Sequence, residues 1–189
     1  AETEDSSGRG HTATLRGAQI AEAGRFGGCL ETFRGHPVED KPHQATVKSA
    51  ADLSPTGAFT LEMWVSPKPE LEGYPEAFLM DKKYVSHNDY QWTLSAAGSS
   101  GGRSMNMRLG FGAQSESFIS KPLKLEAGKW RHLAFTYDGE GTGRFFADGA
   151  ACGSATFAGR KGIVAGTHAL CIGDRVGSLY HGFPGYIDQ

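Results

Sequence analysis

The stretch 128–149, GKWRHLAFTYDGEGTGRFFADG, constrains the fold of this chain more than any other part of it. Its first half alternates between two faces, and one face carries only large apolar residues: Leu133, Phe135 and Tyr137. This period of two is typical of a β-strand whose faces meet different surroundings. Asp-Gly pairs at 138–139 and 148–149 flank a second apolar run. Asp-Gly between apolar runs is a strong hairpin signal, because glycine adopts positive φ easily. The stretch therefore predicts antiparallel strands joined by tight turns.

The same alternation occurs in segments 59–65, 90–95 and 105–111, and shorter apolar runs lie between them. The 27 glycines and eight prolines indicate many turns, which suits a chain of short strands. We find neither the pattern of a long helix nor an internal repeat. The expected fold is all-β.

The order of the motifs resembles that of laminin-G-like jelly-roll domains of the concanavalin A-like lectin and glucanase family. The Trp130 strand and its turns resemble the family's W-H-x-A-x-x-Y-D-G core, and 59–65 matches F-T-L-E-x-W-V. Segments like D-x-S-G-x-G and G-x-x-G-x-A-L-x-F occur near the start, and 183–188 resembles the closing F-x-G-x-I-D. The resemblance implies an antiparallel β-sandwich jelly roll.

A chain of 189 residues suits one domain, so we expect a single laminin-G-like domain over 1–189. Family domains usually carry another strand before the first motif and a further segment after the last. The resemblance therefore implies a domain cut from a larger protein at one or both ends. We expect a further strand, from the same protein or another chain, beside Tyr186–Asp188.

The charge balance disfavours some partners. The net charge is −2 and the sequence contains no dense Lys/Arg cluster, so nucleic acid and anionic membranes are not expected partners. No apolar run approaches the ~20 residues of a membrane span. The resemblance implies an extracellular, periplasmic or cell-surface protein, with neighbouring domains and a carbohydrate or protein ligand as partners.

Catalytic motifs are absent from the sequence. Glucanases of this fold carry Glu-x-Asp-x-x-Glu on one strand, which sets two carboxylates ~5–5.5 Å apart. Here Glu62 is the only carboxylate on its strand, and neither G-x-S-x-G nor H-E-x-x-H occurs. We therefore expect non-catalytic recognition of a glycan or protein. The alternatives are a glycoside hydrolase or polysaccharide lyase of this fold, and a purely structural spacer domain.

Two sets of side chains are candidates for carbohydrate binding. Sugars stack on flat aromatic rings, and their hydroxyls pair with planar amides and guanidinium groups. The first set should line the sheet face opposite the core: Glu62, Trp64, Gln91, Asn106, Arg108 and His132. The second set lies in loops at one rim: Tyr84, His87, Tyr90, Arg175, Tyr180 and His181. The alternative for the first set is that Glu62 and Trp64 are buried scaffold, since both belong to the family motif.

A structural calcium ion is the expected cofactor, because jelly rolls of this kind often bind one near the chain ends. The positions that match the family are Asp5 and Asp188. Calcium requires 6–8 oxygen ligands, which glycine-rich loops can supply through carbonyls. The alternative is that Asp5 caps a turn and Asp188 is solvated.

The cysteine count is odd, with Cys29, Cys152 and Cys171. Cys152 and Cys171 fall in segments expected to be neighbouring strands and are the candidate disulfide. The alternative is three buried free thiols, because spacing alone does not establish connectivity.

Overall fold

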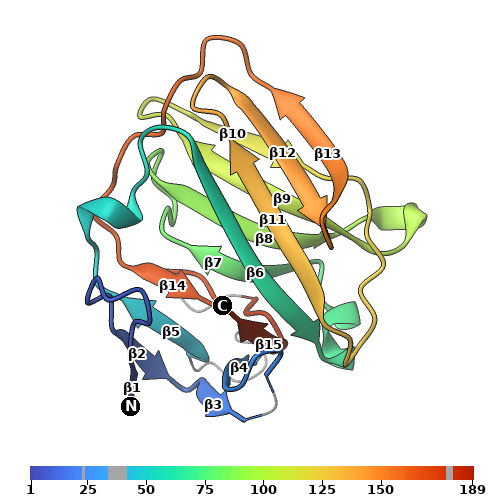
Figure 1. The fold of residues 1–189 in the computed structure, drawn as a ribbon. Coiled ribbons are helices and arrows are strands. Elements are labelled where there is room, and N and C mark those ends of the chain that lie inside the picture. The colour runs from blue at the N-terminus through green and yellow to red at the C-terminus, as the bar shows by residue number, and fades with distance from the viewer. Residues whose placement is uncertain (23, 34–41, 178–180) are drawn as a thin grey trace.

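The computed structural model describes residues 1–22, 24–33, 42–177 and 181–189. Two antiparallel sheets pack face to face (Figure 1), so the predicted all-β sandwich is confirmed. One sheet has eight strands, in the order β1 (Glu2–Thr3), β2 (Ala13–Arg16), β5 (Gln44–Val47), β14 (Leu170–Ile172), β7 (Glu76–Asp81), β8 (Tyr90–Ala96), β9 (Arg103–Gly110) and β10 (Ser115–Ile119).

The other sheet has seven strands, in the order β13 (Ala150–Thr156), β12 (Thr142–Ala147), β11 (Arg131–Tyr137), β6 (Phe59–Pro67), β15 (Gly185–Asp188), β4 (Cys29–Thr32) and β3 (Gln19–Ala21). The helices of the described part of the chain are three short 3₁₀ turns, at Ala51–Leu53, Pro69–Gly73 and Gly98–Ser100. None of its helices is long and apolar enough to span a bilayer.

The predicted hairpin stretch forms two neighbouring strands of the seven-stranded sheet, next to its edge strand β13. Strand β11 pairs with β12, and β12 turns at Asp148 and Gly149 into β13. Both turn residues have positive φ, 48° and 79°, as a two-residue type I′ turn requires. The Asp148 carboxylate also accepts a hydrogen bond from the His132 amide at 2.9 Å. Strand β13 contains Cys152, whose segment was expected to be a strand, although its small side chains (AACGSAT) lack a strong apolar alternation.

The core lies between the two sheets and contains the apolar faces expected from the sequence. Phe135 is fully buried, and its ring lies 4.8 Å from Phe145 of the same sheet and 5.7 Å from Phe118 of the opposite sheet. Edge-on and tilted aromatic pairs of this kind add stability beyond their buried area. The eight-stranded sheet contributes the apolar faces of β8 and β9 to the same core. Their buried side chains are Tyr90, Trp92, Leu94, Met105, Met107 and Leu109.

Strand β15 is paired along both edges. Tyr186 is in register with Glu31 of β4 on one side and with Ser66 of β6 on the other. The prediction of a further strand beside Tyr186–Asp188 is therefore wrong, because no backbone groups there await a partner strand. The alternation of the sequence identified the strand but not its neighbours.

The predicted Cys152–Cys171 disulfide is also wrong. Both cysteines are free thiols, as is Cys29. Cys152 lies on β13 of the seven-stranded sheet and Cys171 on β14 of the eight-stranded sheet. The two segments are consecutive in sequence, but the chain crosses from one sheet to the other between them. Burial raises the pKa of Cys171 well above its usual range, which keeps it an inert thiol.

Candidate functional site

The first predicted set of binding residues divides between the two outer surfaces of the sandwich. Glu62 and Trp64 lie on β6, and His132 lies beside Trp64 on β11, in the seven-stranded sheet. The others, Gln91, Asn106 and Arg108, lie on β8 and β9 of the eight-stranded sheet. They therefore cannot form one surface. Alternation shows which residues share a face of one strand, but it does not show which sheet that strand joins.

The Trp64 group forms a cluster of its own with the loop before β4. The indole lies 5.2 Å from the His132 ring and 5.8 Å from Phe26, and the Arg25 guanidinium lies 5.0 Å from the indole. Glu62 approaches His132 at 3.4 Å. His132, Phe26 and Arg25 therefore surround the indole, which favours a scaffold role for this cluster.

The eight-stranded sheet carries a hollow of about 480 Å³ on its outer surface, within the range of small-ligand sites. Five candidates from the two predicted sets come together there. They are Gln91 and Arg108 from the strands, and Tyr84, His87 and Arg175 from the loops. Five further lining residues were not predicted: Glu76, Phe78, Lys83, Val85 and Ser115.

The floor of the hollow includes Gln91 and Arg108, which belong to a row of polar side chains across four strands. Asp81 of β7 is in register with Gln91 of β8, which is in register with Arg108 of β9. Arg108 is in register with Ser117 of β10, and its Nε donates to the Ser117 hydroxyl at 3.3 Å. Paired residues of neighbouring strands project on the same side ~5 Å apart. The row therefore presents amide and guanidinium donors in fixed order.

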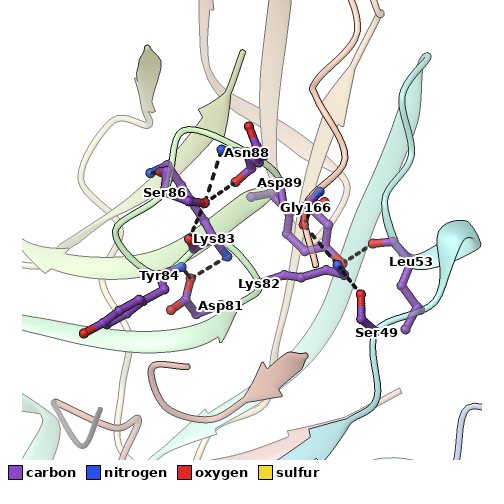
Figure 2. Close-up of polar contacts among 11 residues, drawn as sticks. Ser49, Leu53, Asp81, Lys82, Lys83, Tyr84, Ser86, Asn88, Asp89 and Gly166 are labelled. Carbon is purple, nitrogen blue, oxygen red and sulfur yellow. Dashed lines mark hydrogen bonds and ion pairs between the residues drawn. The ribbon is translucent and has the colours of Figure 1, made fainter. Parts of the chain in front are cut away.

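The wall of the hollow is the loop 82–89, which a buried ion pair anchors (Figure 2). Lys82 Nζ lies 3.0 Å from Asp89 Oδ2, and both side chains are 0% exposed. Lys82 also donates to Ser49, and Asp89 accepts the Gly166 amide at 2.9 Å. The ion pair thereby holds the two ends of the loop together. Between them, Val85 and His87 are exposed to solvent.

Asp81 anchors the two rim segments that carry Tyr84 and Arg175. Its Oδ1 accepts the Tyr84 amide at 2.9 Å, and its Oδ2 accepts the Val176 amide at 3.0 Å, next to Arg175. Burial raises the pKa of Asp81, although these backbone donors oppose the rise. Tyr84 has φ 51°, a strained conformation for a residue with a side chain. Its ring extends away from the network in Figure 2.

Tyr84 and Arg175 contact one another at the rim. The Arg175 guanidinium lies 4.9 Å from the Tyr84 ring and 6.0 Å from the Phe78 ring. On the opposite side, His87 Nδ1 lies 2.9 Å from the Ser115 hydroxyl, which ties the loop tip to β10. The hollow thus has an aromatic side and a polar side, which is the combination that sugars require.

The remaining rim candidates do not contribute to the hollow as described. Tyr90 was predicted at the surface but is 2% exposed in the core, where its hydroxyl donates to the Leu53 carbonyl at 3.2 Å. That prediction is wrong, because Tyr90 belongs to the apolar alternation of β8 and not to the loop before it. His181 packs edge-on against Tyr74 at 5.2 Å, and Tyr180 lies outside the described residues.

Lys83 was missed although it follows Lys82 directly. Strand β7 ends at Asp81, and the side chains of the next two residues point in different directions. Lys82 is buried in the interior, whereas Lys83 lines the hollow. The available signal was a pair of adjacent lysines immediately after an apolar strand. Only the folded loop shows that they have different roles.

The two predicted calcium ligands line one shared hollow at the end of the sandwich. Asp188 is buried and accepts the Phe26 amide at 2.9 Å. Asp5 accepts the Ser7 and His11 amides, and hydrogen bonding from Ser7 in particular holds its pKa well below the usual range. Within the described ranges, no group of three or more acidic, His or Cys side chains could hold a metal. Asp5 and Asp188 would therefore need backbone carbonyls to complete the 6–8 oxygen ligands of calcium, and calcium stays a prediction.

The architecture is a β-sandwich of two antiparallel sheets with a hollow on one outer surface. Residues 40–189 match the sequence profile of the concanavalin A-like lectin/glucanases superfamily. The chain therefore belongs to this superfamily, as its motifs indicated. No curated protein matches the sequence.

Solved structures share the fold at low sequence identity. The binding domain of Paraclostridial Mosquitocidal Protein 1 superposes with a TM-score of 0.70 at 14% identity, over 97% of this chain and 44% of that one. The botulinum neurotoxin serotype C1 binding domain superposes with a TM-score of 0.67 at 13% sequence identity, over 97% of this chain and 45% of that one. The chain thus spans less than half the length of these toxin domains.

A third structure is of similar size to this chain. Domain 4 of AbnA, a GH43 extracellular arabinanase from Geobacillus stearothermophilus, was solved in complex with arabinotriose. It superposes with a TM-score of 0.65 at 19% identity, over 98% of this chain and 83% of that one. At these identities the likenesses establish the common fold.

Proposed function

We propose that this domain is a non-catalytic recognition module that binds a glycan in the hollow beside loop 82–89. The observation that carries the proposal is the convergence of Tyr84, Gln91, Arg108 and Arg175 on that hollow from four separate segments. Together they supply an aromatic face and planar hydrogen-bond donors, held in place by the Asp81 and Asp89 networks. A protein ligand that uses the same donors is the second candidate.

The proposed absence of catalysis rests on the carboxylates near the hollow. Among the described residues that line it, Glu76 is the only acidic one, and its Oε1 accepts the Thr93 hydroxyl at 3.0 Å. Asp81 is fully buried beneath the floor and cannot reach a substrate. Glycoside hydrolysis uses two carboxyl groups that flank the scissile bond. One accessible carboxylate can orient a sugar but cannot act as both acid and nucleophile.

The similar proteins support the same proposal. One was solved with arabinotriose and is a domain of an extracellular arabinanase, and others are binding domains of toxins. In each case a domain of this fold serves a larger protein. We propose the same setting here, an extracellular recognition domain with neighbouring domains.

Replacing Tyr84 by alanine is expected to weaken glycan binding about two- to tenfold, because one aromatic contact contributes ~0.5–1.5 kcal/mol. A glycan array identifies a ligand, and calorimetry measures the affinities of the wild type and the variant. The matched control is Phe26→Ala, which removes a 59% exposed aromatic ring from the opposite sheet. It should bind as the wild type does.

Two results would contradict the proposal. Loss of binding in Phe26→Ala but not in Tyr84→Ala would move the site to the Trp64 cluster. Release of reducing sugar from a bound glycan, abolished by Glu76→Gln, would support the hydrolase alternative.

The calcium prediction is tested by thermal unfolding. An ion held by Asp5 and Asp188 would stabilise only the native state, so EDTA should lower the midpoint and excess calcium should restore it. Asp188→Ala should remove that response. Identical melting curves with EDTA and with calcium would leave Asp188 as a buried acceptor for the Phe26 amide.

A further inference from the structure

Three cationic side chains from distant parts of the sequence meet in the hollow. They are Lys83 after β7, Arg108 on β9 and Arg175 after β14. The only carboxylate among the described lining residues is Glu76. The chain as a whole carries a net charge of −2, so this surface is opposite in sign to the protein.

The cations are close enough to influence one another. Burial first, and then the nearby Arg108 and Arg175 charges, lower the pKa of Lys83, although Asp81 opposes the shift. Lys83 is 3% exposed, and its ammonium donates to the Ser86 carbonyl. Like charges gathered in this way repel each other, and an arriving anion would relieve the repulsion.

Neither Arg108 nor Lys83 has a carboxylate within ion-pair distance in the described part of the chain. Some cations on other surfaces of the protein are paired with carboxylates, as in Lys68 with Glu31 and Arg160 with Glu116. Arg108 is exposed and bonds only to the Ser117 hydroxyl through Nε. Its terminal nitrogens are therefore available to a ligand from solvent.

We propose that the hollow selects acidic glycans by binding an anionic group of the sugar, a carboxylate or a sulfate, between Arg108, Lys83 and Arg175. The inference rests on the proposed glycan-binding function and adds the ligand class to it. Guanidinium groups pair with such anions through two parallel hydrogen bonds, and charge-assisted bonds are about twice as strong as neutral ones. Tyr84, which stacks on Arg175, would contact the apolar face of the same sugar.

The experiment compares an acidic oligosaccharide with its neutral ester and with a sulfated oligosaccharide. Calorimetry measures the affinity of the intact protein for an oligogalacturonide, for its fully methyl-esterified form and for a sulfated galactan oligosaccharide. The acid should bind at least about tenfold more tightly than its ester, because at least one charge-assisted contact is lost with the charge. This preference should shrink as salt rises, because exposed charges are screened within ~10 Å at 0.1 M.

The variant Arg108→Gln should remove most of the preference for the acid, because glutamine keeps a planar hydrogen-bond donor but carries no charge. Arg144→Gln, an exposed arginine on β12 of the other sheet, is the matched control and should behave as the wild type. Tighter binding of the sulfated oligosaccharide would identify sulfate as the anion, and tighter binding of the uronide would identify carboxylate.

The outcomes separate this inference from the function on which it rests. Equal binding of acid and ester, unchanged in Arg108→Gln, would overturn the selection for anions while glycan binding stands. Binding of none of the three would contradict both. If a glutamate-rich peptide binds more tightly than every oligosaccharide, the ligand is an acidic protein segment and the inference is wrong.

Discussion

Replacing Lys82 by methionine should destabilise the folded domain by about 3–5 kcal/mol, the usual effect of removing one partner of a buried ion pair. Lys82 and Asp89 are both 0% exposed and 3.0 Å apart. Methionine fills much of the lysine volume but leaves the Asp89 carboxylate without its counter-charge. The Gly166 amide, at 2.9 Å from Asp89 Oδ2, then provides the remaining hydrogen bond to that oxygen.

Urea unfolding measures the loss, and two further variants identify its cause. The double variant Lys82→Met with Asp89→Asn removes both charges and should recover a large part of the stability. Asparagine suits position 89, where φ is 55°, because it tolerates the left-handed region better than most residues. Lys161→Met, at an exposed lysine, is the control and should change stability by less than about 0.5 kcal/mol.

Ligand binding should fall together with stability in Lys82→Met, since the ion pair closes the loop that carries Tyr84 and His87 (Figure 2). If the variant unfolds at the same urea concentration as the wild type, the pair contributes nothing to holding the loop. A variant that is destabilised but binds normally would show that the loop keeps its shape without the pair.

The fold followed from the sequence because alternation reports burial directly. Phe135 and Met107 lie on faces with period two, and both are fully buried in the structure. The Asp148-Gly149 turn was recognisable because few residue pairs adopt positive φ at both positions. The order of the strands in each sheet could not be predicted from the sequence in the same way. Strand β15 lies between β4 and β6, and no local pattern indicates which distant strands pair.

The site could be predicted only in part, for the same reason. Tyr84, Gln91 and Arg108 were identified by residue type, but Trp64 was grouped with Gln91 and Arg108 although it lies on the other sheet. The sequence contains no dense basic cluster, yet the fold assembles Lys83 with Arg108 and a third cation from separate segments. Such convergence depends on which strands are neighbours, and that information is not local.

The substitution Gly110→Ala should destabilise the domain by about 3 kcal/mol and weaken glycan binding more than tenfold. A methyl group at Gly110 would lie 2.4 Å from the His87 carbonyl carbon and oxygen and 2.5 Å from the Asn88 amide nitrogen. These are backbone atoms, so no side chain can rotate away, and overpacking of this kind typically costs 1–3 kcal/mol or more. The φ of Gly110 lies outside the left-handed region, so the effect comes from the contact alone.

The loop must therefore move off the sheet to admit the methyl group. Gly110 also donates its amide to the Asp89 carbonyl at 2.8 Å, and Gly112 donates to the His87 carbonyl at 2.7 Å, so both bonds would lengthen together. Gly73→Ala is the matched control, because a methyl group there meets no atom within 4 Å and its φ is likewise not left-handed. It should melt and bind as the wild type does. Normal melting and normal binding in Gly110→Ala would mean that loop 82–89 does not pack on β9 and cannot form the wall of the hollow.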